Sequence, residues 1–103
     1  MTDTIEKLTE HLRTHREDGF CVKPIACKSG LTMSVQASSM HYCSPKSNEG
    51  PWTSVEVGYP SKRVAELRPY RETSSPRQRV SPIHTFVPMK VVATIVDKHG
   101  GLV

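Results

Sequence analysis

The residues best suited to covalent chemistry in this chain are three cysteines and five histidines. A cysteine nucleophile needs a base within hydrogen-bond reach and a third group that orients this base. His41 and Cys43 lie two positions apart, and on an extended strand their side chains would point the same way. The chain lacks the GxSxG, HExxH, phosphate-loop and dinucleotide-binding glycine motifs. We therefore expect a protein that is not an enzyme.

The same residue types could supply a zinc site, but their spacing does not suit one. The candidate ligands are Cys21, Cys27, His41 and Cys43. Zinc knuckles place paired ligands roughly two to four residues apart, whereas Cys21 and Cys27 stand six apart. His11 and His15 share one face of a predicted helix, without the carboxylate of an HExxH motif. We predict no metal and no cofactor, with the cysteines acting as small hydrophobic residues of the core.

The net charge of +4 is concentrated in one segment. Between Ser61 and Val80 stand six of the 14 basic residues but only two of the ten acidic ones, so the rest of the chain is neutral. The six basic residues are Lys62, Arg63, Arg68, Arg71, Arg77 and Arg79. A localised positive charge attracts an acidic partner. The predicted partner-binding residues are Arg63, Arg68, Arg71, Arg77, Arg79, Tyr42 and Tyr59.

The charge leaves the class of partner open. Arginine forks bind phosphate and bases stack on aromatic rings, which favours a nucleic acid. Protein interfaces are enriched in Tyr, Trp, Met and Arg, and Met40 and Tyr42 lie in a loop upstream of the arginine segment. Trp52 is expected to anchor the core and not to bind the partner, because a single tryptophan in a small domain is usually buried. A solvated helix face and loop that bind nothing specific would carry the same charge.

The first half of the chain predicts a helix followed by strands. Apolar residues at helical spacing predict an amphipathic helix over Thr4–Arg16. Phe20–Cys27 is interrupted by Pro24 and suits a short edge strand. Alternating apolar residues over Leu31–Ser38 and Trp52–Tyr59 predict two strands that pair as a hairpin. The loop between them is long, which is typical of functional or mobile segments.

The second half predicts a short helix, a strand and a final helix. Ser61 suits the N-cap of a short helix over Ser61–Leu67 that stops near Pro69. The strand Ile83–Val87 would place Ile83, Thr85 and Val87 on one face. After Pro88, apolar residues at helical spacing favour a helix that ends at Gly100, although their β-branched side chains also suit a strand. Residues 68–80 are expected to form a mobile arginine loop that becomes ordered on binding.

Together these elements predict an α+β fold in a single domain over residues 1–103. A roughly three- to four-stranded antiparallel sheet would carry the N-terminal and C-terminal helices, with a long arginine-rich loop. No segment approaches the roughly 20 apolar residues of a transmembrane helix, and the first residues lack an apolar signal segment. We expect no contact with membranes, reduced thiols and a location in the cytoplasm.

Two parts of the sequence resemble small accessory proteins encoded by phages and prophages of enteric bacteria. The first resemblance is carried by His41–Pro45, Gly50–Trp52 and Val55–Ser61, the second by Val87–Pro88 and His99–Gly101. The junction at Thr85–Phe86 departs from the pattern. The resemblance implies no activity and no catalytic residues.

What the resemblance implies is a biological context. Short phage proteins often bind a host machine stoichiometrically, and many antagonise bacterial defence, including CRISPR–Cas complexes. The protein is then expected to act in the host cytoplasm as an anti-CRISPR or other anti-defence inhibitor. It would bind a host protein or ribonucleoprotein and block it by occlusion. The alternative is a phage regulator that binds nucleic acid directly.

Overall fold

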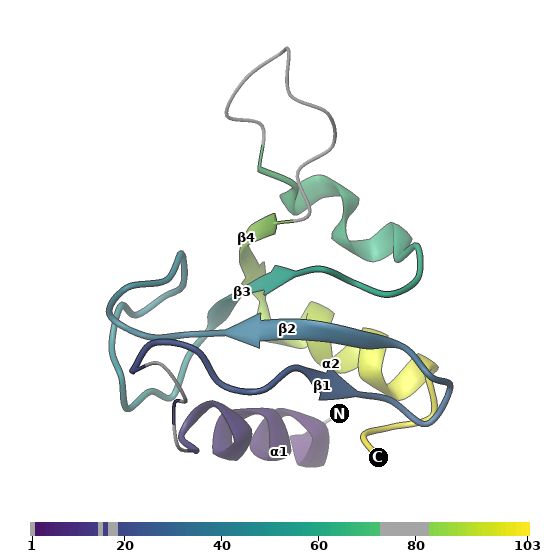
Figure 1. Ribbon diagram of the computed structural model, residues 1–103, viewed down its shortest axis with the longest axis horizontal. Helices are drawn as coiled ribbons and strands as arrows, with labels where there is room; N and C mark the ends of the chain where they lie inside the picture. Colours follow the sequence, from purple (N-terminus) through teal and green to yellow (C-terminus); the bar gives the residue numbers. More distant parts are fainter. Residues whose placement is uncertain (1, 15, 17–18, 73–82) are drawn as a thin grey trace.

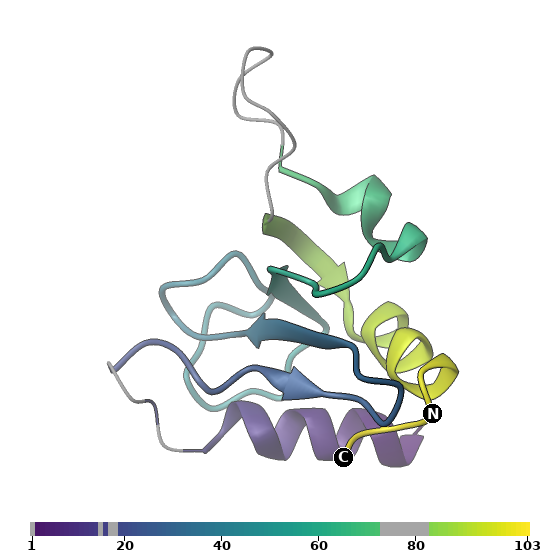
Figure 2. The ribbon, with the colours of Figure 1, turned by 45° about the vertical axis from the view of Figure 1, so that its right-hand side comes forward.

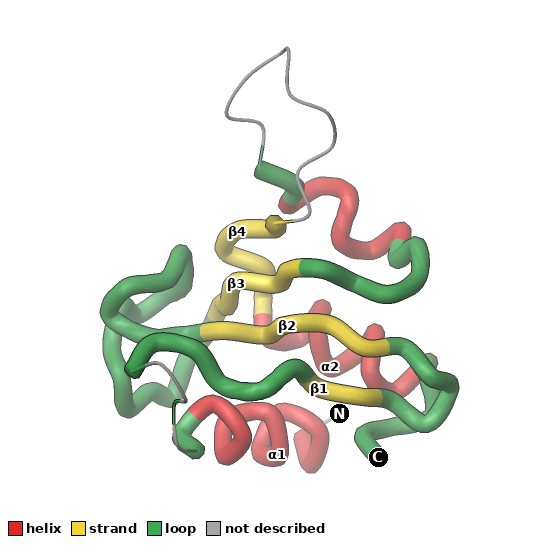
Figure 3. The backbone as a smooth tube through the Cα atoms, viewed as in Figure 1, coloured by secondary structure: helices red, strands yellow, loops and turns green. Residues whose placement is uncertain are grey.

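Four strands form one antiparallel sheet in the order β1-β2-β3-β4 (Figure 1, Figure 3). The computed structural model describes residues 2–14, 16, 19–72 and 83–103. The strands are β1 (Ile25–Ala26), β2 (Thr32–Gln36), β3 (Ser54–Gly58) and β4 (Ile83–Pro88). The helices are α1 (Thr2–Leu12), the 3₁₀ helix η1 (Ala65–Tyr70) and α2 (Met89–Lys98). The predicted α+β class, with its antiparallel sheet and two terminal helices, is confirmed.

Helices α1 and α2 contact each other and lie on the same face of the sheet, as the rotated view shows (Figure 2). Leu8 and Leu12 of α1 and Val92 and Ile95 of α2 are fully buried, in one core with the inward residues of β2 and β3. Both helices are therefore confirmed, although α1 begins two residues before the predicted start and ends at Leu12. Within the described residues, no helix is long and apolar enough to cross a membrane.

The end of α2 follows the predicted glycine stop. Gly100 has a φ of +87°, and its N–H donates to Asp97 O at 3.2 Å, while Gly101 N–H donates to Val96 O at 2.9 Å. These two bonds satisfy the last carbonyls of the helix in a Schellman arrangement. The chain then returns to the outer edge of β1, where Val103 N–H donates to Ala26 O at 3.0 Å. The short edge strand is thus covered by the last residues of the chain.

The predicted hairpin is formed by β2 and β3, with Val35 opposite Val57. Both valines are fully buried, as the alternating pattern requires. The long connection between the strands is packed against the body of the protein. Trp52 is only 4% exposed, and its indole N–H donates to Ser47 O at 2.9 Å. The interpretation of Trp52 as a core anchor is confirmed.

Strand β4 corrects the predicted alternation. Val55 of β3 pairs with Val87, but Val57 pairs with His84, so β4 contains one more residue than β3 over this stretch. The extra residue is a β-bulge, and Phe86 within it has a φ of +50°. His84 and Val87 are therefore buried, whereas Thr85 is only partly so. The prediction that Ile83, Thr85 and Val87 share one face was wrong because the bulge reverses the side chains between them.

The predicted helix over Ser61–Leu67 is also corrected. Ser61 does not cap a helix, because its N–H donates to Thr32 O and its hydroxyl accepts the Thr32 N–H at 2.9 Å. These bonds tie the chain after β3 to the first residue of β2. The helix that forms is η1, which begins at Ala65 and contains Pro69. Proline is better tolerated in such a short 3₁₀ helix than inside an α-helix, where it would clash with the preceding turn.

Candidate anion-binding pocket

One cavity of about 710 Å³ lies where β3 leaves the sheet, η1 begins and β4 returns. Its lining combines basic side chains with one tyrosine and one histidine. The lining residues are Tyr59, Pro60, Ser61, Lys62, Arg63, Val64, Ala65, Arg68, Arg71 and His84. Four of these residues are lysine or arginine, and none is Asp or Glu. The described residues therefore bring four positive charges to one concave surface without a carboxylate in its wall.

The backbone after β3 fixes the position of these side chains. Tyr59 has a φ of +53°, which turns the chain away from the sheet and leaves its ring 68% exposed. Lys62 reaches back to the β1–β2 turn, where its ammonium donates to Ser29 O at 2.9 Å. Helix η1 then carries Arg68, and Arg71 follows its end. Arg71 forms an antiparallel bridge with His84, so the chain after η1 is tied to β4.

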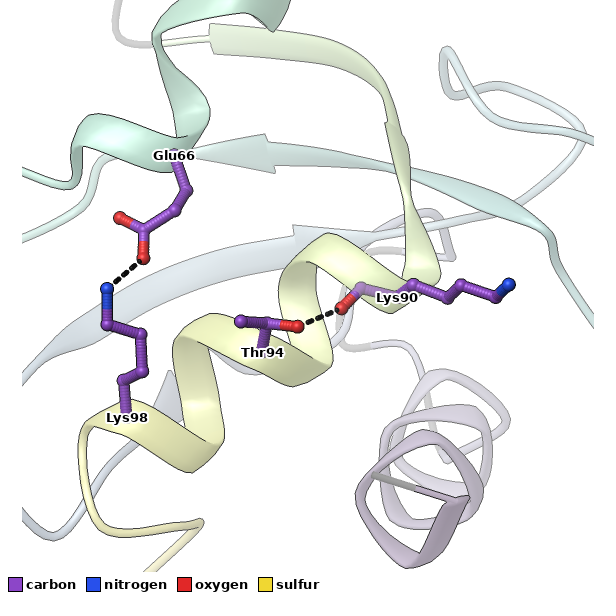
Figure 4. A network of polar contacts seen from close by, with 4 residues as sticks. All are labelled: Glu66, Lys90, Thr94 and Lys98. Carbon is purple, nitrogen blue, oxygen red and sulfur yellow. Dashed lines mark hydrogen bonds and ion pairs between the residues drawn. The ribbon is translucent and has the colours of Figure 1, made fainter.

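The acidic residue of η1 is directed away from the pocket. Glu66 lies on η1, and its carboxylate accepts a hydrogen bond from Lys98 of α2 at 2.8 Å (Figure 4). The same close-up shows the Lys90 side chain extending away from Glu66, while Thr94 donates to the Lys90 carbonyl. The hydrogen bond from Lys98 lowers the pKa of Glu66, and it places the negative charge against α2. The charge of the pocket is therefore not offset by its own helix.

His84 and Arg71 form the inner wall of the pocket. His84 is 6% exposed, and its Nδ1 lies 3.0 Å from Val57 O, where it donates as an N–H. Burial lowers the pKa of His84, and the nearby Arg71 charge lowers it further. The imidazole is therefore neutral at neutral pH, with Nε2 as an acceptor. The Nε–H of Arg71 is buried and has no hydrogen-bond acceptor among the described residues.

The structure brings together four of the predicted partner-binding residues, Tyr59, Arg63, Arg68 and Arg71. Tyr42 is not part of this pocket. Its ring is 49% exposed, lies 6.2 Å from the ring of Phe86 and is covered on one side by Lys46. Arg77 and Arg79 lie outside the described residues, as does most of the expected arginine loop.

Comparison with models of known protein families, with curated protein sequences and with solved structures finds no match to this chain.

Sequence reasoning did not assign Lys62 or His84 to the site. Lys62 stood in the basic segment, so its charge was a signal that it belongs with Arg63. His84 carried no such signal, because only the bulge in β4 turns its ring inward beside Val57. The charge of the segment was also expected to reside mainly in residues 68–80. Among the described residues it is shared equally, since Lys62 and Arg63 line the pocket with Arg68 and Arg71.

The extended geometry that would let the side chains of His41 and Cys43 point the same way is not formed. Cys43 N–H donates to His41 O at 2.9 Å, so the chain makes a tight turn there and is not extended. Cys43 is 1% exposed, its Sγ–H donates to Ser38 O, and burial raises the pKa of this thiol. Burial likewise raises the pKa of Cys27. In the part of the chain that the structure describes, no three His, Cys, Asp or Glu side chains are placed to hold a metal ion.

The ion pair between Glu66 and Lys98 leads to a first prediction. In a double-mutant cycle with Glu66→Gln and Lys98→Gln, we expect a coupling below about 1 kcal/mol at neutral pH, because Lys98 is 64% exposed. Glu66 has a lower pKa in the folded than in the unfolded protein, so this stability is present above the unfolded pKa. It is lost as the pH falls through the folded pKa. Urea denaturation at several pH values measures it.

Lys90→Gln is the matched control for this cycle, since it removes a charge from the same helix without a contact to Glu66. It should show no coupling to Glu66→Gln. An equal coupling for both lysines would mean that the ion pair is only a general effect of the charge on α2.

Proposed function

We propose that this is a non-enzymatic binding protein that captures an acidic partner in its basic pocket. The observation that carries the proposal is the cavity lined by Lys62, Arg63, Arg68 and Arg71 without any carboxylate. Guanidinium groups offer paired N–H donors that match carboxylate and phosphate oxygens.

The partner we propose is a host protein or ribonucleoprotein machine, which this protein inhibits by occlusion. The support for this finer proposal is the resemblance to phage accessory proteins, many of which act against bacterial defence systems such as CRISPR–Cas complexes. The pocket provides the physical means. A ligand held there would face Tyr59 and the η1 segment, and the bulk of the domain would cover the partner's acidic surface.

A second candidate is direct binding of nucleic acid, and the position of Tyr59 favours it. Its ring is 68% exposed and lines the same cavity as the four cations. Binding sites for single strands combine a positively charged groove with aromatic rings on which bases stack. The arrangement around Tyr59 has both parts, so a free oligonucleotide is a reasonable test ligand.

The experiment that separates the two candidates is fluorescence anisotropy with labelled single-stranded RNA and DNA oligonucleotides at two salt concentrations. If the four cations each neutralise one phosphate, the slope of log affinity against log salt should be about −3. Affinity would then fall about fiftyfold between roughly 50 and 200 mM salt. Capture from host lysate, with and without nuclease, is run in parallel.

The outcomes differ for each candidate. Salt-dependent binding of free oligonucleotides supports the nucleic-acid candidate. Capture of a host protein that survives nuclease, without oligonucleotide binding, supports the inhibitor. If neither experiment finds a partner at low salt, the basic pocket is not a binding site and both candidates fail.

A further inference from the structure

Cys21 differs from the other two cysteines in its surroundings. Cys27 is 2% exposed and Cys43 is 1% exposed, whereas Cys21 is only partly buried. Its Sγ lies 3.7 Å from Nε2 of His41, which is within the range of a hydrogen bond to sulfur. The opposite ring nitrogen, Nδ1 of His41, lies 2.6 Å from the hydroxyl of Ser38. A thiol, a base and a group that orients the base are therefore in line.

Ser38 is suited to hold this imidazole in one orientation. It is 1% exposed, so its hydroxyl has little competition from water. The Ser38 oxygen also accepts the Met40 N–H at 3.0 Å, which fixes its position. A base at Nε2 of His41 requires the tautomer in which Nδ1–H donates to the second lone pair of this oxygen, rather than the one in which the hydroxyl donates to Nδ1. In that arrangement Nε2 of His41 is free of its own proton and able to take the thiol proton of Cys21.

The backbone on both sides of Cys21 is tied to the segment that carries Ser38. On one side, Arg16 donates to Phe20 O at 3.0 Å and to Ala37 O at 2.9 Å. On the other side, the buried amide of Gln36 makes two 2.8 Å hydrogen bonds with the N–H and C=O of Val22. The residues before and after Cys21 are thus bound to the residues just before Ser38. This scaffold sets the distance between the thiol and His41 without relying on side-chain contacts alone.

We propose that Cys21 is a reactive thiol, activated by His41 as base and by Ser38 as a positioning residue, and that it is a modification site for small hydroperoxides. The thiol proton moves from Sγ to Nε2 of His41, and the thiolate sulfur attacks the terminal oxygen of the hydroperoxide. The S–O bond forms as the O–O bond breaks, and the leaving oxygen takes the proton from His41. The thiol is oxidised by two electrons to sulfenic acid, and hydrogen peroxide is reduced to water.

The test is carried out on the full folded chain near neutral pH, with two readouts. The far-ultraviolet absorbance of thiolate is compared between the wild-type protein and Cys21→Ser, with Cys43→Ser as the matched control. The rate at which each cysteine is alkylated by iodoacetamide or oxidised by hydrogen peroxide is measured by mass spectrometry of peptides. In the peroxide reaction, dimedone traps sulfenic acid.

We expect thiolate absorbance that Cys21→Ser removes and Cys43→Ser retains. His41→Gln and Ser38→Ala should each abolish it and slow modification of Cys21 about threefold to fivefold, because a paired thiolate is more abundant but somewhat less nucleophilic. Cys27 and Cys43 should react only after unfolding.

Each variant is first checked for native circular dichroism. Because Ser38 is buried and its removal can unfold the protein, the partly buried His41→Gln is the deciding variant. The proposal is overturned if folded His41→Gln leaves the rate and the absorbance unchanged, or if wild-type protein shows no thiolate. Binding of an acidic partner should be unaffected by Cys21→Ser, so this test is independent of the proposed function.

Discussion

Reversal of three exposed charges in the pocket, by Lys62→Glu, Arg63→Glu and Arg68→Glu, is expected to reduce affinity for an acidic partner at least about a hundredfold. The loss of only two hydrogen bonds to charged groups, at about 1.5 kcal/mol each, already corresponds to roughly that factor. The new carboxylates would also repel the ligand. Anisotropy with the RNA oligonucleotide and capture from host lysate both measure the effect.

These three residues are chosen to limit the effect on folding, although Lys62→Glu gives up an exposed hydrogen bond to Ser29 O. All three side chains are exposed, whereas Arg71 is partly buried and pairs with β4 through its backbone. Exposed substitutions usually change stability by less than about 0.5 kcal/mol, so the thermal midpoint should stay near that of the wild type. Arg71 is therefore left unchanged in this variant.

The matched control changes the same total charge at exposed lysines outside the pocket, by Lys7→Glu, Lys28→Glu and Lys90→Glu. It should lose only the small part of the affinity that comes from long-range attraction, and this part should vanish at high salt. If both triple variants lose binding equally, net charge and not the pocket attracts the partner. If neither loses binding, the partner is bound on another surface, such as the one around Tyr42.

The largest effect on stability is expected for Gly50→Ala, at about 3 kcal/mol. Gly50 has a φ of +69°, and an added Cβ would lie 2.6 Å from the ring of Trp52. The backbone conformation alone costs an alanine about 1–2 kcal/mol, and forcing the buried ring to shift adds a similar amount. Since Trp52 is the one tryptophan, its fluorescence reports directly on this contact. Urea denaturation gives the free energy of unfolding.

Gly101→Ala is the control that separates the two causes. Gly101 has a similar φ of +89°, but an added Cβ would meet nothing within 4 Å. We expect a cost of about 1 kcal/mol with native tryptophan fluorescence. If Gly50→Ala and Gly101→Ala lower the free energy of unfolding equally, backbone conformation causes both losses, and the Trp52 ring moves aside without a penalty.

The parts of the fold that repeat a simple period were predictable from sequence. The alternation around Val35 and Val57 gave both strands of the hairpin and the buried face of each, and the stop at Gly100 ended α2 as expected. The failures lie where a long-range contact overrides a local preference. Ser61 is a good N-cap by itself, yet its hydrogen bonds go to Thr32 of another strand. Nothing in the residues next to Ser61 indicates that Thr32 would take its hydrogen bonds.

For the candidate sites too, local clusters were predictable and long-range contacts were not. The pocket was predictable as a cluster of charge because Arg63, Arg68 and Arg71 are close in sequence. His84 was not, because its inward orientation depends on one extra residue in β4. The pairing of His41 with Cys21 was likewise missed in favour of Cys43, since spacing along the chain said nothing about a turn that reverses one side chain.

The most direct test of the central claim, that the basic pocket holds an acidic ligand, is an amide NMR titration of nitrogen-labelled protein. Two polyanions, a short single-stranded RNA and polyglutamate, are added separately at low salt. The first and largest shifts, with either ligand, should fall on residues 59–71 and on His84. The pocket does not hold an acidic ligand if both ligands leave these amides unchanged, or if they shift another surface, such as the one around Tyr42 and Phe86, at lower concentration.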